Sequence, residues 1–510
     1  MTRVLVIGAG HNGLICGLHL AAAGVDVEVL EHASRPGGAT TSSARTLPGF
    51  IHDDHAAFAP MTVASPAMRE LGLHRDGAGM TWVDAPTVMA HPFEDGTAIA
   101  LHRDLDATVA SLGGAAGAGW RAAMDRLLPH ADTLVTTILG PLPPVVGPLR
   151  LAASLRRDGP EWIRRMTGSI EALGLDLFAG DRRATAWLSG SAQHSGLPPS
   201  TAGSGAFGLM LQILGHRRGW PFPRGGMGTL ADALAARARH AGARIRCDAH
   251  VEAMVIRRGR VVGARLASGE EISADAVVST VSALPLVELL PPGTLPGRLE
   301  RRLQRWRYGT GAFKVDYALS APVPWAAPEP RAAAVVHVAG GLQALSAAAQ
   351  AGGRGELPDR PALVVGQQSL LDPTRAPAGR HTLYVYAHVP ASYDVPDGDV
   401  ADRIEAQIER FAPGFGDTVL ARAIRAPHQT AAENPSMVDG DLGGGTMELD
   451  QQLIFRPAPE LARYRTPLRG LYVAGASVHP GGAVHGMSGR GAARALLGDR
   501  RLRPWRAPKG

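Results

Sequence analysis

At 510 residues the chain is too long for one compact core, and its 45% hydrophobic content predicts a well-folded protein of two or more subdomains. The formal net charge is +6, but the basic residues are scattered, so we expect no nucleic-acid partner. Cys16 and Cys247 lie far apart and form no CxxC pair, which argues against a disulfide framework or a dithiol redox centre. Electrons must therefore be carried by something other than cysteine. We also expect no metal site.

The first hydrophobic run, residues 4–7, begins almost at Met1 and is typical of a strand. We therefore expect no signal or transit peptide, and a cytoplasmic location. The nearest approach to the roughly 20 apolar residues of a spanning helix is residues 133–155, which several prolines interrupt. That run would form either core helices or a membrane-facing entrance with peripheral membrane contact.

The chain opens with a strand, a glycine turn, a helix to about residue 23 and a second strand at residues 25–30. Gly8 permits a tight turn, Gly10 lets the backbone approach a pyrophosphate, and Gly13 lets helix and strand pack closely. Glu31 ends the second strand, where a carboxylate accepts hydrogen bonds from a ribose. The pattern predicts a Rossmann-type dinucleotide site, whose turn is Gly8, Ala9, Gly10, His11, Asn12 and Gly13.

Two further glycine segments favour FAD over NAD. The segment at residues 37–40 would place extra backbone amides against the pyrophosphate, through Gly37, Gly38, Ala39 and Thr40. Near the other end of the chain, a strand at residues 471–474 is followed by a turn and a helix whose N-terminus can stabilise negative charge on reduced flavin. We assign to this second half of the flavin site Gly475, Ala476, Gly482 and Val484. Neither cysteine lies near the expected flavin ring, so FAD should be bound non-covalently.

The expected architecture is α/β, with a Rossmann-type FAD-binding domain and an interleaved α+β substrate domain. The discontinuous FAD-binding domain comprises residues 1–85, 220–285 and 440–510. The substrate-binding domain comprises residues 86–219 and 286–439. Within the FAD-binding domain we expect a helix at residues 229–241 and strands at residues 244–256, 261–266 and 274–279. Within the substrate-binding domain we expect strands at residues 312–319 and 382–389 and a helix at residues 400–411.

Five stretches carry a family resemblance: GAGHNG at residues 8–13, WPFPRGGMGTL at 220–230, GAFKVDYAL at 311–319, LDQQLIFRPAP at 449–459 and LYVAGASVHPGGAVHG at 471–486. Through them the chain resembles the phytoene-desaturase-related flavoproteins, and most closely the subgroup called pyridine nucleotide-disulfide oxidoreductase domain-containing protein 2. The resemblance covers essentially the whole chain. It implies an amine-oxidase-like fold and implies that Val251 presents its backbone to the adenine.

One departure concerns the substrate. Many carotenoid desaturases carry an acidic residue after the C-terminal glycine, where this chain has Ala476 and Ser477, so the resemblance does not by itself imply a carotenoid. His479 and His485 flank the same turn and are candidates to touch flavin or substrate. A structural hydrogen-bonding role is the alternative for each.

Lys314 is one of two lysines in a chain that otherwise uses arginine, and it lies inside an apolar strand. An amine can lose its proton when desolvated, as arginine cannot. In amine-oxidase-fold enzymes a lysine near flavin N5 holds a water, which gives Lys314 a candidate catalytic role. The alternative is a buried salt bridge with Asp316, two residues along the same face.

The expected reaction is a two-electron dehydrogenation, in which a largely apolar small molecule passes a hydride to flavin N5, loses a proton and gains a C=C or C=N bond. No second GxGxxG occurs in a strand-to-helix context, so oxygen or a quinone is the expected electron acceptor. The alternatives on the same fold are an FAD-dependent amine oxidase and a redox-neutral flavin isomerase. The non-enzyme alternative is a binding protein like the GDP-dissociation inhibitors, against which the intact glycine motifs argue.

Overall fold

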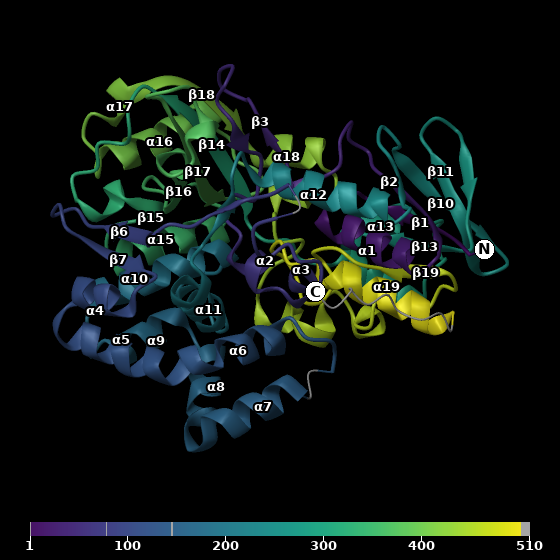
Figure 1. Cartoon of the computed structure of the whole chain (residues 1–510), viewed down its shortest axis with the longest axis horizontal. Coiled ribbons are helices and arrows are strands. Elements are labelled where there is room, and N and C mark those ends of the chain that lie inside the picture. The colour runs from purple at the N-terminus through teal and green to yellow at the C-terminus, as the bar shows by residue number, and fades with distance from the viewer. Residues whose placement is uncertain (1, 78, 144–145, 501–510) are drawn as a thin grey trace.

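The computed structural model describes residues 2–77, 79–143 and 146–500. The end of the expected FAD-binding domain beyond residue 500, and Pro144 of the proline-interrupted run, lie outside the described residues. Two separate sheets organise the chain, and Figure 1 shows them side by side, with the smaller one to the right.

The smaller sheet has five parallel strands in the order β19-β13-β1-β2-β9. Their bounds are Arg3–Ile7 (β1), Asp26–Leu30 (β2), Arg244–Arg246 (β9), Ala276–Ser279 (β13) and Leu471–Val473 (β19). Helix α1 (His11–Ala22) packs against both α12 (Met227–His240) and α19 (Met487–Asp499). The sheet thus joins strands from three distant parts of the sequence, all within the segments expected for the FAD-binding domain.

The region expected as one strand at residues 244–256 is divided in the structure. Its first part is β9, at the edge of the parallel sheet, and its second part is β10 (Val251–Arg257), which pairs antiparallel with β11 (Arg260–Leu266). The antiparallel ladder ends with β12 (Glu271–Ser273). Asp248 has φ of +52° between β9 and β10, a conformation that no continuous strand contains.

The larger sheet has seven strands in the order β18-β14-β17-β16-β15-β6-β7, with β6 and β15 parallel and the other neighbours antiparallel. The bounds are Thr87–Pro92 (β6), Ala98–His102 (β7), Gly311–Leu319 (β14), Ala333–Val338 (β15), Leu363–Gly366 (β16), His381–Val389 (β17) and Val419–Arg425 (β18). Alternation decides the faces of β14: Phe313 and Val315 join a core with α16 (Asp397–Glu409), whereas Ala312 faces the core of the helical layer.

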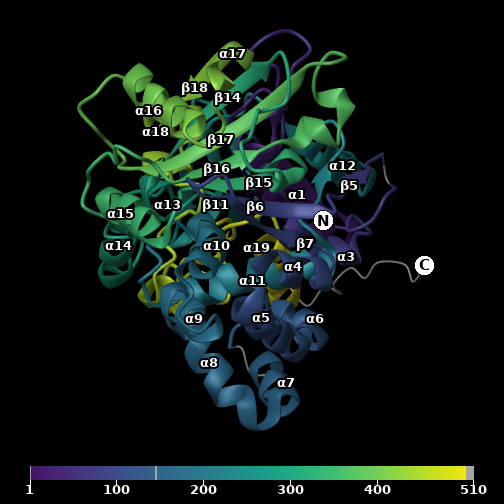
Figure 2. The same cartoon turned by 90° about the vertical axis from the view of Figure 1, so that its left-hand side faces the viewer.

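That helical layer lies below the larger sheet in Figures 1 and 2. It consists of α4 (Leu105–Leu112), α5 (Gly114–Leu127), α6 (Ala131–Ile138), α7 (Val146–Leu155), α8 (Gly159–Thr167), α9 (Ile170–Leu177), α10 (Arg182–Ala192) and α11 (Ser204–Arg218). On the larger sheet's side the chain also forms α15 (Leu342–Gly353), α17 (Phe415–Thr418) and α18 (Pro427–Glu433). In the part of the chain that the structure describes, no helix combines the length and hydrophobicity needed to cross a bilayer.

Short elements connect the two sheets. They are α2 (Pro60–Ala64), α3 (Pro66–Glu70), the pair β3 (Ser42–Ser43) and β4 (His52–Asp53), and the pair β5 (Trp82–Val83) and β8 (Phe222–Pro223). Helices α13 (Ala283–Glu288) and α14 (Gly297–Gln304) send Leu286, Leu299 and Leu303 into the core of the parallel sheet. The boundary expected at residue 285 is therefore wrong, because α14 packs on the side of the smaller sheet.

Candidate cofactor and substrate site

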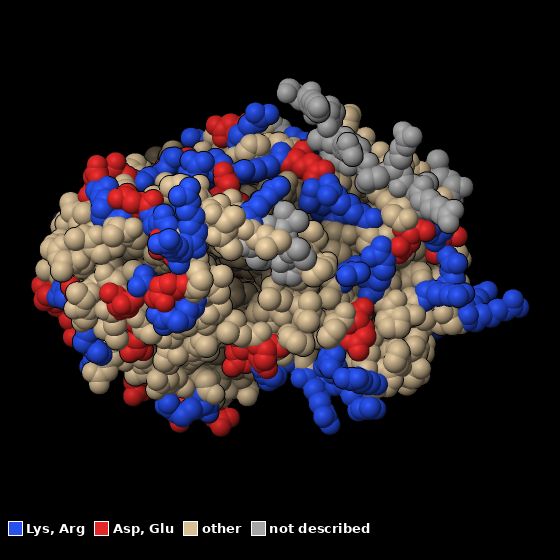
Figure 3. All heavy atoms as spheres, turned by 90° about the horizontal axis from the view of Figure 1, so that it is seen from below, with Lys and Arg blue, Asp and Glu red and all other residues tan. Residues whose placement is uncertain are grey.

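One cavity of about 2100 Å³ extends between the two sheets. Small-ligand pockets occupy roughly 300–1,000 Å³, so this space suits a dinucleotide together with a substrate. Its wall combines the glycine turns of the smaller sheet with side chains from the helical layer and from β14, β16 and β17. In Figure 3 the face seen from below is hollowed near its centre, within a largely uncharged surface.

The first glycine turn has the geometry that a pyrophosphate site needs. Gly8 has φ of +94°, and a Cβ on Gly13 would lie 1.9 Å from the Gly8 carbonyl oxygen, so neither position accepts a side chain without strain. At Gly10, by contrast, a Cβ would meet no atom within 4 Å, and this residue lines the cavity. No side chain caps α1, which leaves its first amides available to an anion.

The second glycine pair packs on the first turn. The Gly37 amide donates to the Ala9 carbonyl at 2.9 Å, and a Cβ on Gly38 would lie 3.1 Å from the Gly10 Cα. The Thr40 hydroxyl donates to the Gly37 carbonyl at 2.7 Å and closes the turn. The two turns therefore present one continuous backbone surface to the cavity.

The Glu31 carboxylate binds the backbone of the first glycine turn. Its Oε2 accepts from the Ala9 amide at 2.6 Å, and its Oε1 accepts from the Ala33 amide at 3.0 Å. A carboxylate has about four acceptor positions, so two remain for ribose hydroxyls. Glu31 and Val251, at the start of β10, both line the cavity.

The C-terminal turn closes the opposite end of this surface. Gly475 has φ of +95°, and a Cβ there would lie 2.3 Å from the Thr280 carbonyl oxygen, so glycine is required. The Gly475 amide donates to the Ser488 hydroxyl in the first turn of α19. The glycine thus fixes β19 to the start of that helix.

The structure divides the expected site residues into two groups. Those on the cavity wall are Gly8, Gly10, His11, Asn12, Glu31, Gly38, Ala39, Val251, Gly475, Ala476, His479, Gly482 and Val484. Those that do not line it are Ala9, Gly13, Gly37, Thr40, Lys314 and His485. The first group, with the open approach at Gly10 and the uncapped helix, fits the pyrophosphate, ribose and flavin parts of FAD.

The two candidate histidines differ. His485 is buried; its Nε2 donates to the Gly481 carbonyl at 3.1 Å, and its Nδ1 accepts from the Met487 amide. Burial lowers the pKa of His485 to about 3, so it is a neutral residue that holds the turn and does not reach the cavity. His479 does line the cavity, and its Nε2 donates to the Gly140 carbonyl at 2.7 Å, which joins the turn to the helical layer.

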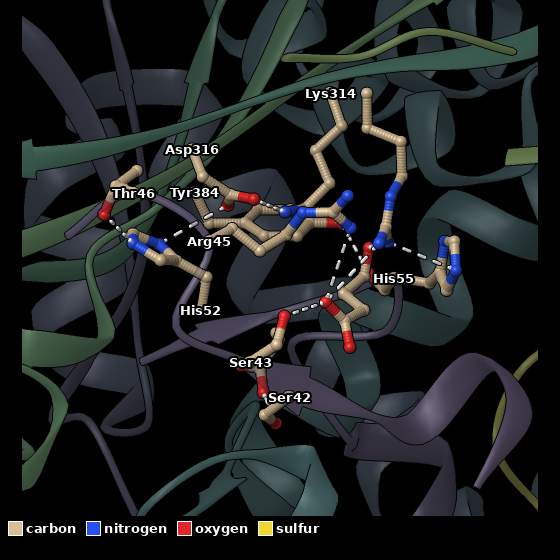
Figure 4. Close-up of polar contacts among 12 residues, drawn as sticks. Ser42, Ser43, Arg45, Thr46, His52, His55, Lys314, Asp316 and Tyr384 are labelled. Atoms are coloured by element: carbon tan, nitrogen blue, oxygen red, sulfur yellow. Dashed lines mark hydrogen bonds and ion pairs between the residues drawn. The ribbon is translucent and has the colours of Figure 1, made fainter. Parts of the chain in front are cut away.

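Lys314 forms the buried ion pair, with Asp316 as its partner (Figure 4). Its ammonium also lies 4.7 Å from the centre of the Tyr384 ring, and His52 contacts Asp316 at 3.5 Å. Strand alternation places Lys314 and Asp316 on one face of β14, as their spacing requires. Tyr384, and not Lys314, lines the cavity, so the geometry supports the structural role and not the catalytic one.

Two polar groups on the wall were not expected from the sequence. Asp54 lies among three guanidinium groups: it pairs with Arg35 at 3.1 Å and Arg425 at 3.5 Å, and lies 3.7 Å from Arg45. The Ser43 hydroxyl donates to Asp54 at 2.6 Å. Four of these residues lie within residues 35–54, but Arg425 comes from β18, and no local sequence pattern marks their meeting with it.

The second group is a chain of neutral side chains on the substrate side. The Tyr386 hydroxyl lies 3.3 Å from His194 Nδ1, and His194 Nε2 lies 3.0 Å from His337 Nε2. Burial lowers the pKa of His194 to about 4 and raises the pKa of Tyr386, so both are uncharged at neutral pH. Tyr386 and His194 line the cavity.

Comparison with known proteins is consistent with this geometry. The family model for flavin-containing amine oxidoreductases matches residues 13–497. The pyridine nucleotide-disulfide oxidoreductase domain-containing protein 2 of Mus musculus is 28% identical, over 97% of this chain and 93% of that protein. Hydroxyneurosporene desaturase of Cereibacter sphaeroides is 29% identical, over 98% of both chains. The solved structure of cyclohexylamine oxidase from Brevibacterium oxydans superposes with a TM-score of 0.59 at 16% identity, covering 98% of this chain and 99% of that one.

Substitution by alanine should affect stability and FAD affinity differently at Gly10 and at Gly13. Gly13→Ala forces its Cβ against the Gly8 carbonyl, so the free energy of unfolding of the apo-protein should fall by about 1–3 kcal/mol or more. In Gly10→Ala the added methyl group meets open space, so the free energy of unfolding should change by no more than about 1 kcal/mol, which is the cost of a poorer helix cap. The affinity for FAD should fall, because the methyl group lies on the cavity wall. Urea unfolding and flavin titration measure the two effects. Normal FAD affinity in Gly10→Ala would contradict the assignment.

Lys314→Met should act on stability and not on flavin chemistry. Removing the ammonium leaves the Asp316 carboxylate buried without its cation, so the free energy of unfolding should fall by about 3–5 kcal/mol. The rate of flavin bleaching per bound flavin should stay near that of the wild type. The double variant Lys314→Met/Asp316→Asn removes both charges and should recover much of the loss. Slow bleaching in a variant of normal stability would instead restore the catalytic role.

Proposed function

The chain belongs to the flavin-containing amine oxidoreductase family and is an FAD-dependent oxidoreductase, and from this premise we propose that it dehydrogenates a largely apolar, uncharged small molecule. The product would carry a new C=C or C=N bond. The cofactor supplies the two-electron acceptor chemistry, and the protein selects and positions the substrate.

The uncharged part of the cavity wall, which the helical layer supplies, carries this proposal. The residues between 134 and 211 that line the cavity include no Asp, Glu, Lys or Arg, within the part of the chain that the structure describes. They are mostly apolar, such as Leu134, Ile138 and Met210. The inner strands add Val364, Tyr384 and Tyr386 to the wall. A cationic ligand buried here would lack a counter-charge, which is costly in an apolar environment.

The polar groups at this end suit a neutral ligand atom. Tyr386 and His194 already hydrogen-bond to each other, and each is uncharged at neutral pH. A few such groups in an apolar pocket orient a ligand and do not supply charge. This supports dehydrogenation of the kind that the name of hydroxyneurosporene desaturase states, more than oxidation of a cationic amine. We propose oxygen or a quinone as the electron acceptor.

A panel of reductants tests the proposal under anaerobic conditions. Neutral apolar compounds that can gain a C=C bond, such as a partly saturated polyene, should bleach the flavin, whereas putrescine and cyclohexylamine should not at neutral pH. Ala206→Asp places a carboxylate on the uncharged wall and should raise the concentration of apolar reductant needed for half-maximal bleaching by about tenfold or more.

The matched control is Ala236→Asp, at an exposed position of α12 outside the cavity wall. It should leave bleaching unchanged. Bleaching by amines alone would replace this proposal with an amine oxidase, and a product of unchanged mass would replace it with a flavin isomerase.

We further propose that the apolar substrate reaches the cavity from a membrane surface. Ile163, Leu449 and Leu453 line the cavity, yet 45%, 46% and 48% of their surfaces are exposed to solvent. Ile454 and Phe455 continue this exposed apolar segment, with 41% and 49% exposed. Large apolar side chains around the opening of a cavity are typical of a surface that meets lipid or another apolar partner.

Vesicle flotation tests this contact. Ile454→Ser/Phe455→Ser should reduce co-flotation with vesicles of phosphatidylcholine and phosphatidylglycerol severalfold, without altering the cavity wall. Leu420→Ser is the control, because Leu420 is equally exposed, at 46%, but lies on β18 away from the cavity wall. Equal flotation of the wild type and the double variant would rule the contact out.

A further inference from the structure

Gly443, Gly444 and Gly445 form a third glycine segment on the cavity wall, and we call them the triple-glycine loop. The loop packs on the C-terminal turn of the expected flavin site: a Cβ on Gly444 would lie 2.7 Å from the Ala476 Cβ, and one on Gly482 would lie 3.1 Å from the Gly443 Cα. Only residues without side chains allow this approach. The loop is therefore part of the wall beside Ala476 and Gly482.

A carboxylate and a guanidinium hold the loop in place. Asp441 accepts hydrogen bonds from the amides of Gly443 and Gly445, both at 2.6 Å. Arg456 donates to the carbonyls of Gly443 at 2.7 Å, Thr446 at 3.1 Å and Ala476 at 3.0 Å. Arg456 does not itself line the cavity, so its guanidinium lies directly behind residues that do.

The charge of Arg456 is unusual among the buried arginines. Arg375 pairs with Asp53 and Asp372, and Arg425 pairs with Asp54 and Glu433, whereas Arg456 forms no ion pair with any carboxylate of the described chain. All four of its hydrogen bonds go to carbonyl oxygens. Burial lowers its pKa to about 10, against the attraction of Asp441, so it remains a cation at neutral pH.

A buried cation without a carboxylate partner is costly, and a neutral side chain would also donate hydrogen bonds to carbonyls. The cost is offset when a negative charge develops nearby. Two-electron reduction of a flavin adds such a charge when only one proton accompanies the electrons. A fixed cation close to the flavin therefore favours the reduced anion over the neutral oxidised form.

We propose that Arg456 is a positioning residue that holds the triple-glycine loop against the flavin and supplies the positive charge that stabilises the anionic reduced flavin. The inference rests on FAD binding and not on the identity of the substrate. It predicts a property of the bound flavin, the reduction potential, which is measurable without any substrate.

Paired substitutions separate charge from packing. Arg456→Gln keeps a hydrogen-bond donor but removes the charge, and it should lower the affinity for reduced relative to oxidised FAD about tenfold, which is a fall of about 30 mV in the two-electron potential. Arg456→Lys keeps the charge but not the planar fork of donors, so it should lose stability and yet keep a potential near that of the wild type. Photoreduction in the presence of a reference dye gives the potentials, and thermal unfolding gives the stabilities.

Arg375→Gln is the matched control. Arg375 is as deeply buried as Arg456, but its contacts, Asp53, Asp372 and Pro223, do not line the cavity. It should lose stability without a shift in potential. If Arg456→Gln and Arg456→Lys both lose stability while neither changes the potential, Arg456 is only a structural clamp and the proposal fails.

The wild-type protein gives an independent test should Arg456→Gln fail to fold. From about pH 6 to about pH 8 the potential should fall by about 30 mV per pH unit, because one proton accompanies two electrons when the reduced flavin stays anionic. A slope of about 60 mV per pH unit would show that the reduced flavin is protonated and would overturn the proposal.

Discussion

The contact between Gly13 and the Gly8 carbonyl sets how closely α1 approaches the parallel sheet. With no side chain at Gly13, the helix starts directly above the end of β1, and its uncapped amides open onto the cavity. Later segments pack on this contact: the Gly37 amide bonds to Ala9, and α19 lies against α1, where a Cβ on Gly489 would lie 1.9 Å from the Asn12 carbonyl oxygen. The dinucleotide site is thus one packed unit of backbone from three parts of the chain.

Buried charge is distributed around this unit in two ways. Arg375, Arg425 and Lys314 each pair with carboxylates, and such pairs fix geometry at little net gain in stability. Arg375 and Arg425 bind the segment that follows the second glycine pair through Asp53 and Asp54. Lys314 and Asp316 pair within β14, and His52 of that segment contacts Asp316. Arg456 is different because its partners are carbonyls of the cavity wall. The paired charges therefore serve the junction of the two sheets, and the unpaired charge is available to the cofactor.

The part of the cavity wall that the helical layer supplies follows a contrasting rule, since it is largely apolar and its few polar groups are neutral. Desolvation keeps His194 uncharged, and the ring lies within hydrogen-bonding distance of both Tyr386 and His337. One cavity thus joins a polar backbone surface, suited to phosphates and ribose, to an apolar chamber. Exposed residues such as Leu453 extend the apolar character to the protein surface.

The sequence by itself determined the parts of the site that depend on local backbone geometry. Gly8, Gly10, Gly13, Glu31 and Gly475 lie where their spacing predicts, because a tight turn, a helix start and a strand end are decided by neighbouring residues. Tertiary structure alone decided which long-range partners meet. It brought the Lys314–Asp316 pair to Tyr384 and His52. It also brought His194 to Tyr386 and Arg456 to Ala476. Such contacts join residues far apart in the chain, and their energies depend on burial and on partner geometry, which a linear sequence does not contain.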